Sequence, residues 1–259
     1  MDFVLVSDLH MDEHPFDIKV FDIPENKERI LLNLGDTFTS TPFCTKYIAR
    51  FMSKISVYFK YVIFCLGNHD FYSQSISDAY IDVKRELQRI GNDNIIFLDG
   101  DTIFEVPDTN IVVYGDTIWS WMPKNSKEQN IQDYMSIMSA DKKGHLHFKE
   151  TNEINARALN KIKNFLKANQ HKNVVVATHF PPKYYDTGYP YTWLSYYFHN
   201  DDTTDKWFKE PWMNNVYWIH GHTHCRHDRK YMNTHIISNA RGYSLSPKYF
   251  PKLITVDDE

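Results

Sequence analysis

The chain has 259 residues, of which 42% are hydrophobic and 15% aromatic, and its formal net charge is −4. This composition excludes a disordered chain, because such chains lack aromatic and branched apolar residues. It suits one α/β domain with a sizeable core. The acidic balance does not favour a channel for long nucleic acid, whose binding needs a basic surface.

Short apolar runs in the first quarter of the chain predict buried strands at Phe3–Val6, Ile30–Leu34 and Tyr61–Leu66. Between the last two, apolar residues from Ile48 to Phe59 recur at helical spacing and predict a helix. Since the first strand begins almost at the first residue, we expect no signal peptide.

The next stretch has the pattern of a β-hairpin. Asn94–Leu98 and Thr102–Val106 flank Asp99-Gly100, a dipeptide typical of two-residue turns between paired strands. We therefore predict that these two strands pair with each other.

In the remainder of the chain, short apolar runs occur on both sides of a long stretch with helical spacing. This pattern predicts a long helix from Ile154 to Leu166 and strands at Ile111–Tyr114, Asn173–Ala177, Val216–Ile219, His235–Ser238 and Leu253–Val256. Strands that alternate with helices predict an α/β fold with a mixed sheet, and without a linker or repeat we expect a single domain over residues 1–259.

The cysteines and the hydropathy of the chain indicate which cellular compartment to expect for the protein. Cys44, Cys65 and Cys225 have no spacing typical of a disulfide framework or a zinc ribbon, so a reducing, cytoplasmic setting is expected. No stretch approaches the roughly 18 apolar residues of a membrane span. The oligomeric state is not predicted.

Five short polar motifs follow predicted strands. They are Ser7-Asp8-Leu9-His10, Gly35-Asp36, Gly67-Asn68-His69-Asp70, Thr178-His179 and Gly221-His222-Thr223-His224. Singly, each is equally well a turn or a hydrogen-bonded core residue. Together they lie where ligands bind in α/β sheets, beyond the carboxyl ends of strands. Burying so many polar groups would be costly without metal partners, and a set of nitrogen and oxygen donors suits Mn²⁺, Fe²⁺, Fe³⁺ or Zn²⁺ better than Ca²⁺.

In this order, the five motifs resemble the signature of the calcineurin-like metallophosphoesterase superfamily, over most of the chain. A finer resemblance, to small bacterial and phage-type members, is carried by Gly115–Trp119, Trp218–His224 and Asn239–Tyr243. The resemblance implies a sandwich of two mixed β-sheets flanked by helices. It also implies two divalent metal ions and hydrolysis of a phosphomonoester or phosphodiester by a metal-bridging hydroxide.

The resemblance also implies a role for each residue. The first metal would be held by Asp8, His10 and His224, the second by Asn68, His179 and His222, with Asp36 bridging the two. His69 would be a general acid or a hydrogen-bond donor to the transition state, with Asp70 fixing its tautomer. The substrate would be a small phosphate ester, with nucleotides among the open choices.

Departures from the family pattern narrow the function. Gly35-Asp36 is followed by Thr37-Phe38-Thr39 and lacks the Asp-Arg-Gly of protein Ser/Thr phosphatases, so phosphoprotein phosphatase activity is not expected. Two alternatives stay open: a non-catalytic metal-binding scaffold, and a nuclease. The retained His69 speaks against the scaffold, and the acidic balance speaks against the nuclease.

An aromatic-rich segment at about residues 183–213 is the remaining unusual feature. It contains Tyr184, Tyr185, Tyr189, Tyr191, Trp193, Tyr196, Tyr197, Phe198, Trp207 and Trp212. The segment is either a lid that stacks on the substrate, or a packed cap or subunit contact. The sequence leaves these choices open.

Overall fold

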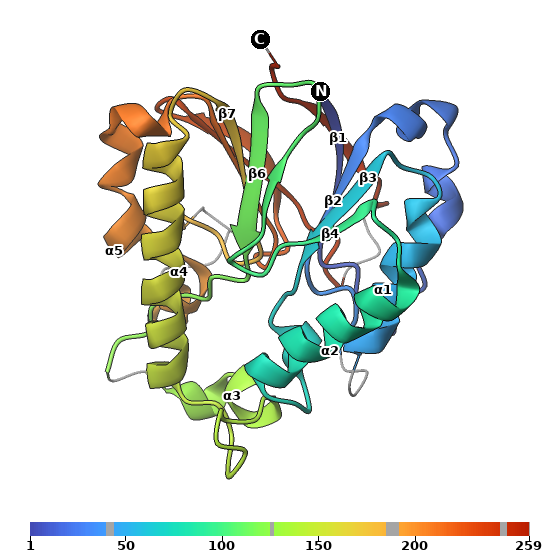
Figure 1. The fold of residues 1–259 in the computed structure, drawn as a ribbon. Coiled ribbons are helices and arrows are strands. Elements are labelled where there is room, and N and C mark those ends of the chain that lie inside the picture. The colour runs from blue at the N-terminus through green and yellow to red at the C-terminus, as the bar shows by residue number, and fades with distance from the viewer. Residues whose placement is uncertain (40–43, 125–126, 185–191, 244–247, 259) are drawn as a thin grey trace.

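Two β-sheets packed face to face form the centre of the molecule, and helices cover both outer faces (Figure 1). The computed structural model describes residues 1–39, 44–124, 127–184, 192–243 and 248–258. The strands are β1 Asp2–Val6, β2 Ile30–Leu34, β3 Tyr61–Cys65, β4 Ile95–Phe97, β5 Ile103–Glu105, β6 Ile111–Asp116, β7 Asn173–Thr178, β8 Val216–His220, β9 Arg226–Tyr231, β10 Thr234–Asn239 and β11 Lys252–Thr255.

Both sheets are mixed, as predicted. In the described chain, one sheet has the order β11-β1-β2-β3-β4, and the other has the order β5-β6-β7-β8-β10-β9. Strands β1 to β4 run parallel with β11 antiparallel at the edge, and β6, β7, β8 and β10 run parallel between the antiparallel edge strands β5 and β9. The carboxyl ends of the parallel strands therefore meet at one end of the sandwich.

The apolar core lies in layers on both faces of each sheet. In β1, Phe3 and Leu5 pack between the sheets, whereas Val4 and Val6 pack on the helical side. Since successive side chains of a strand point to opposite faces, a strand buried on both faces reads as a continuous apolar run. This explains why β1, β2 and β3 were recognisable from the sequence.

Helices α1 Thr45–Ser56 and α2 Ile76–Ile90 cover the five-stranded sheet, and α4 Phe148–Ala168 and α5 Asp201–Thr204 cover the six-stranded one (Figure 1). The short helix α3 Asp133–Ser136 lies beyond the sheets. The sequence analysis did not predict α2, whose buried side chains are only Ala79, Val83 and Glu86. Its ends were a usable signal: Ser75 caps the first turn, and Gly91 ends the helix with φ of 66°.

The hairpin prediction around Asp99-Gly100 is wrong. Strand β4 pairs with β3 in one sheet, and β5 pairs with β6 in the other. The Asp99 side chain accepts hydrogen bonds from the backbone of Asp101 and Thr102, so the turn forms but carries the chain between the sheets. A local turn signal does not fix strand pairing, because each flanking strand gains more by joining a larger sheet.

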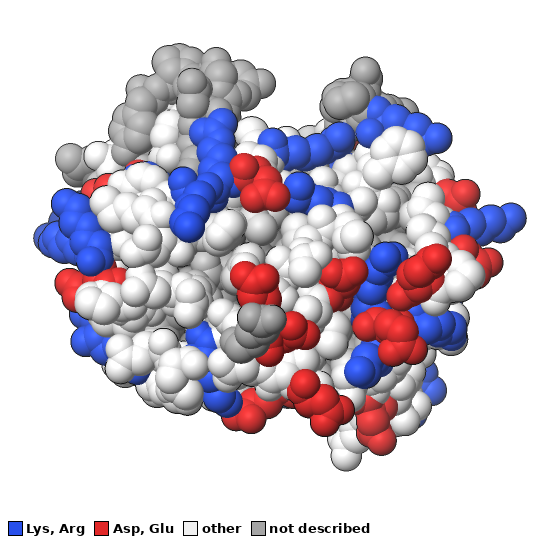
Figure 2. All heavy atoms as spheres, turned by 90° about the horizontal axis from the view of Figure 1, so that it is seen from above, with Lys and Arg blue, Asp and Glu red and all other residues white. Residues whose placement is uncertain are grey.

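Other features agree with the composition. No helix in the described ranges is long and apolar enough to cross a membrane. All three cysteines are free. On the face that carries the chain termini, the described Lys and Arg residues lie interspersed with Asp and Glu (Figure 2).

Candidate metal centre

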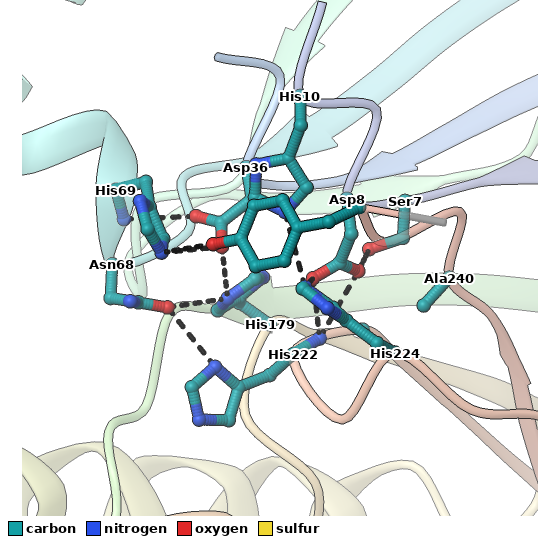
Figure 3. Close-up of polar contacts among 12 residues, drawn as sticks. Ser7, Asp8, His10, Asp36, Asn68, His69, His179, His222, His224 and Ala240 are labelled. Carbon is teal, nitrogen blue, oxygen red and sulfur yellow. Dashed lines mark hydrogen bonds and ion pairs between the residues drawn. The ribbon is translucent and has the colours of Figure 1, made fainter. Parts of the chain in front are cut away.

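The five predicted motifs meet at the carboxyl ends of β1, β2, β3, β7 and β8. Three of these strands belong to the five-stranded sheet and two to the six-stranded sheet, so the site lies across the boundary between the sheets. Figure 3 shows the motif side chains pointing toward one another from these loops. All seven predicted metal ligands are in the group.

The backbone of this group is strained. Asp8, His10, Asp36, His222 and His224 all have left-handed φ angles, between 42° and 65°. Residues other than glycine seldom adopt this conformation, which costs about 1–3 kcal/mol each and persists where the surrounding structure enforces it. The strain turns five donor side chains toward one point.

Glycines allow the motif loops to approach each other. A Cβ on Gly67 would lie 2.1 Å from Oδ1 of Asp36, and a Cβ on Gly221 would lie 2.5 Å from Oδ2 of Asp8. Only glycine therefore fits at these two positions, which explains why both motifs begin with it.

Asp8, His10 and His224 form the first group of donor atoms. Each offers one atom, and the three atoms lie within 4.8 Å of one another. Nε2 of His10 is 3.1 Å from Nε2 of His224, which is 3.4 Å from Oδ1 of Asp8. Nδ1 of His10 faces the Thr39 hydroxyl at 3.0 Å, which leaves Nε2 to face the group. This arrangement suits a cation bound by two imidazoles and a carboxylate.

A second group lies beside the first. The donor atoms of Asp8, Asp36 and His179 also lie within 4.8 Å of one another. Oδ1 of Asn68 is 2.9 Å from Nε2 of His179 and 3.0 Å from Nδ1 of His222. Nδ1 of His179 donates to the Leu34 carbonyl at 2.7 Å, so Nε2 is the ring nitrogen that faces the centre.

Asp133 orients the Asn68 amide, and the sequence analysis did not identify it. Its Oδ1 accepts hydrogen bonds from Nδ2 of Asn68 at 3.0 Å and from the Tyr72 hydroxyl at 2.8 Å. Because the amide nitrogen is held in this way, the amide oxygen faces His179 and His222. Asp133 begins the short helix α3 and lies far from every motif along the sequence, so no local pattern identifies it.

His69 lies beside these groups and is oriented by the backbone. Its Nδ1 donates to the Thr39 carbonyl at 2.8 Å, and its Nε2 lies 4.0 Å from Oδ2 of Asp36. This corrects the predicted role of Asp70. Its Oδ2 instead accepts from the backbone amides of Gly67 and Asp36, both at 2.9 Å. Asp70 ties two motif loops together, and the Thr39 carbonyl fixes the tautomer of His69.

The buried carboxyl groups of the centre differ in pKa. Burial opposes ionisation of Asp8, but the hydrogen bond to His224 and the charge of His179 hold its pKa at about 2. The pKa of Asp36 is also lowered against the effect of burial, chiefly by His179. Burial and the neighbouring Asp36 raise the pKa of Asp70 to about 7. The two carboxylates that face the centre are thus ionised, as metal ligands must be.

The buried imidazoles also differ in the direction of their pKa shifts. Burial lowers the pKa of His10 to about 4 and holds that of His222 well below its ordinary value, so both rings are neutral. Burial also acts to lower the pKa of His179, but the charge of Asp36 outweighs it and raises the pKa to about 9. Neutral imidazole is the form that binds metals.

Two residues near the C-terminus complete the surroundings. The Tyr243 hydroxyl lies 3.2 Å from Nε2 of His69, and its ring packs 4.4 Å from that of His10. Arg241 donates to the backbone carbonyls of Leu9, His14 and Pro15. Arg241 therefore braces the loop after β1.

The described part of the aromatic segment packs against the core. Tyr197, Trp207 and Trp212 are only 5–8% exposed. Phe198 stacks on His222 with ring centres 5.0 Å apart. These contacts support a packed cap. Tyr185, Tyr189, Tyr191 and the Trp193 side chain lie outside the described residues.

Comparison with known proteins agrees with the fold. Residues 1–226 match the family model of calcineurin-like phosphoesterases. An uncharacterized protein of Acanthamoeba polyphaga mimivirus is 29% identical over 243 residues, covering 86% of this chain and 82% of the viral protein.

Solved structures share the fold at low sequence identity. Phosphopantetheinyl hydrolase from Mycobacterium tuberculosis superposes with a TM-score of 0.71 at 15% identity, covering 98% of this chain and 96% of that one. NAD nucleotidase from Haemophilus influenzae superposes with a TM-score of 0.50 at 15% identity, covering 98% of this chain and 49% of that one. From the family match, the chain belongs to the calcineurin-like phosphoesterases and is a metal-dependent phosphoester hydrolase.

Proposed function

We propose that the chain holds two divalent transition-metal ions and hydrolyses a phosphomonoester or phosphodiester of a small molecule, nucleotides included. The observation that carries the proposal is the pair of adjoining donor groups with His69 beside them. Asp8, His10 and His224 would hold the first ion and Asn68, His179 and His222 the second, and Asp36 would be shared by both. The bound ions supply an activated water and positive charge that binds the phosphate.

The protein's own side chains supply orientation and a proton. With Nδ1 donating to Thr39, protonated His69 presents an N–H at Nε2 toward the centre and gives this proton to the departing oxygen. The Tyr243 hydroxyl, 3.2 Å from Nε2, helps to hold the ring in place. Two proteins of the same fold bear the names of enzymes for small phosphate compounds, a phosphopantetheinyl hydrolase and an NAD nucleotidase. We extend this substrate class to the present chain.

The first experiment removes metals and restores Mn²⁺, Fe²⁺, Zn²⁺, Ni²⁺ or Mg²⁺ separately, with p-nitrophenyl phosphate and bis-p-nitrophenyl phosphate as substrates. We expect turnover only after metal is restored, and the preferred substrate separates phosphatase from diesterase. Folded protein that binds two ions and hydrolyses neither compound would contradict the proposal.

Replacing Asp133 with Ala is expected to weaken binding of the second metal by about 10–100-fold, as loss of a hydrogen bond to a metal ligand does. The Asn68 amide would lose the partner that turns its oxygen toward His179 and His222. Calorimetric titration of metal-free protein with Mn²⁺ measures the two sites. The exposed Asp141, replaced with Ala, is the control from the loop that follows α3; equal affinities in both variants would mean that Asp133 does not orient Asn68.

A further inference from the structure

A pocket of about 600 Å³ opens beside His69, and none of the motifs accounts for it. One wall comes from the residues that follow His69, and the other comes from helix α3 and the loop after it. The side chains on these walls include Tyr72, Ser73, Gln132, Met135, Ser136 and Met138.

The two walls are joined rigidly. The Ser73 amide donates to the Ser136 carbonyl at 2.8 Å, and the Met138 amide donates to the Gln74 carbonyl at 3.0 Å. Asp133, from α3, accepts the Tyr72 hydroxyl on one wall and holds Asn68 of the metal centre. The pocket is therefore preformed and has a fixed position relative to the centre, as substrate sites usually do.

The position of the pocket beside His69 indicates which part of the substrate it would hold. In the proposed hydrolysis, the oxygen of water forms a new bond to phosphorus. The bond from phosphorus to the departing oxygen breaks and leaves its electron pair on that oxygen. His69 gives its proton to this oxygen, and the proton lost by the water passes through solvent to restore the ring. The departing group must therefore lie on the His69 side of the phosphate, where the pocket is.

The chemistry of the walls selects the kind of departing group. Among the described residues that line the pocket, none is Lys or Arg. The nearby Lys142 pairs with Asp78 at 2.8 Å, and the buried Asp133 lies behind Tyr72. A second phosphate would therefore find no Lys or Arg on the described walls, whose ionisable side chains are His69, His145 and Tyr72. Met135, Met138 and Tyr72 instead offer an adaptable apolar surface that suits rings, while Gln132 and Ser136 offer neutral hydrogen bonds.

We propose that this pocket binds the leaving group of the substrate, and that it selects an uncharged, ring-bearing alcohol over a group that carries a further negative charge. The proposal rests on the proposed phosphoesterase function and adds the chemical class of the substrate to it.

The test places a charge in the pocket. Met135→Lys is compared with Met232→Lys; the two methionines are 46% and 45% exposed, and Met232 lies in the turn between β9 and β10, away from the pocket. The substrates are phenyl phosphate and 4-carboxyphenyl phosphate, which differ by one carboxylate on the leaving group. The measured quantity is the ratio of kcat/KM for the carboxylated ester to that for the phenyl ester.

We expect the Met135→Lys variant to raise this ratio about threefold to fivefold, as a partly exposed ion pair does, and the Met135→Glu variant to lower it. The Met232→Lys variant should leave the ratio at the wild-type value. A ratio that does not respond at position 135, or that responds equally at position 232, overturns the pocket assignment while the wild-type enzyme is active. A metal-loaded wild type that hydrolyses neither ester overturns the proposed function itself.

Discussion

Replacing Asp36 with Asn is expected to abolish most of the hydrolytic activity, by roughly 10³-fold or more in kcat/KM, since metal-ion catalysis supplies several kcal/mol. Asn keeps the shape of the side chain and can still accept the amide hydrogen of His69, which bonds to Oδ1 at 2.9 Å. It removes the negative charge that lies 3.4 Å from Nε2 of His179, between the two donor groups.

Metal binding distinguishes this loss from a folding defect. Metals that bind only the folded state stabilise it, by about 2.7 kcal/mol at a concentration 100 times the dissociation constant. The wild-type Tm should therefore rise when Mn²⁺ is added to metal-free protein, and the Asp36→Asn variant should show little or no rise. Asp99→Asn, at a carboxylate that pairs with Lys84 away from the centre, is the matched control. An Asp36→Asn variant with the wild-type metal response would show that Asp36 is not a ligand.

Replacing His69 with Ala is expected to lower kcat by about 10²–10⁴-fold, the usual contribution of general acid catalysis. In contrast to the Asp36 variant, it should retain both metals, because His69 belongs to neither donor group. Metal content and kcat measured on the same preparation separate the two effects.

The chemical role of His69 makes a sharper prediction. A phenol such as p-nitrophenol departs without help from an acid, whereas phenol, with a pKa of about 10, gains more from protonation. The activity lost in His69→Ala should thus be larger for phenyl phosphate than for p-nitrophenyl phosphate. Equal losses on both esters would assign His69 to phosphate binding and not to proton transfer.

The metal centre was accessible to sequence reasoning because its residues carry two kinds of signal. Each motif follows a strand that is mostly apolar, and each contains a side chain of a metal-binding type. Three of the five motifs also contain glycine. Gly67 beside Asn68 and Gly221 beside His222 have the spacing that close packing of the loops requires. The order of these pieces along the chain specified the family, and the family match agrees.

Where the sequence analysis failed, the deciding contacts were distant along the chain. The Asp99-Gly100 turn is real, but β4 and β5 pair with strands of different sheets. Asp70 neighbours His69 in sequence, yet its carboxylate reaches the amides of Gly67 and Asp36, and the partner of His69 is the carbonyl of Thr39. Adjacent residues on a tight turn point in different directions, so adjacency does not predict contact.

By itself, the sequence located every strand of the described sheets except the polar edge strand β9, and it indicated seven candidate ligands and a candidate acid, His69, because these depend on local apolar runs and on residue type. The tertiary structure alone decided that the site lies across two sheets, that Asp133 orients Asn68, and that a pocket whose described lining has no Lys or Arg lies beside His69. These features arise from segments 60 or more residues apart, such as Asn68 and Asp133. Their meeting is fixed by packing of the whole chain and not by any local propensity.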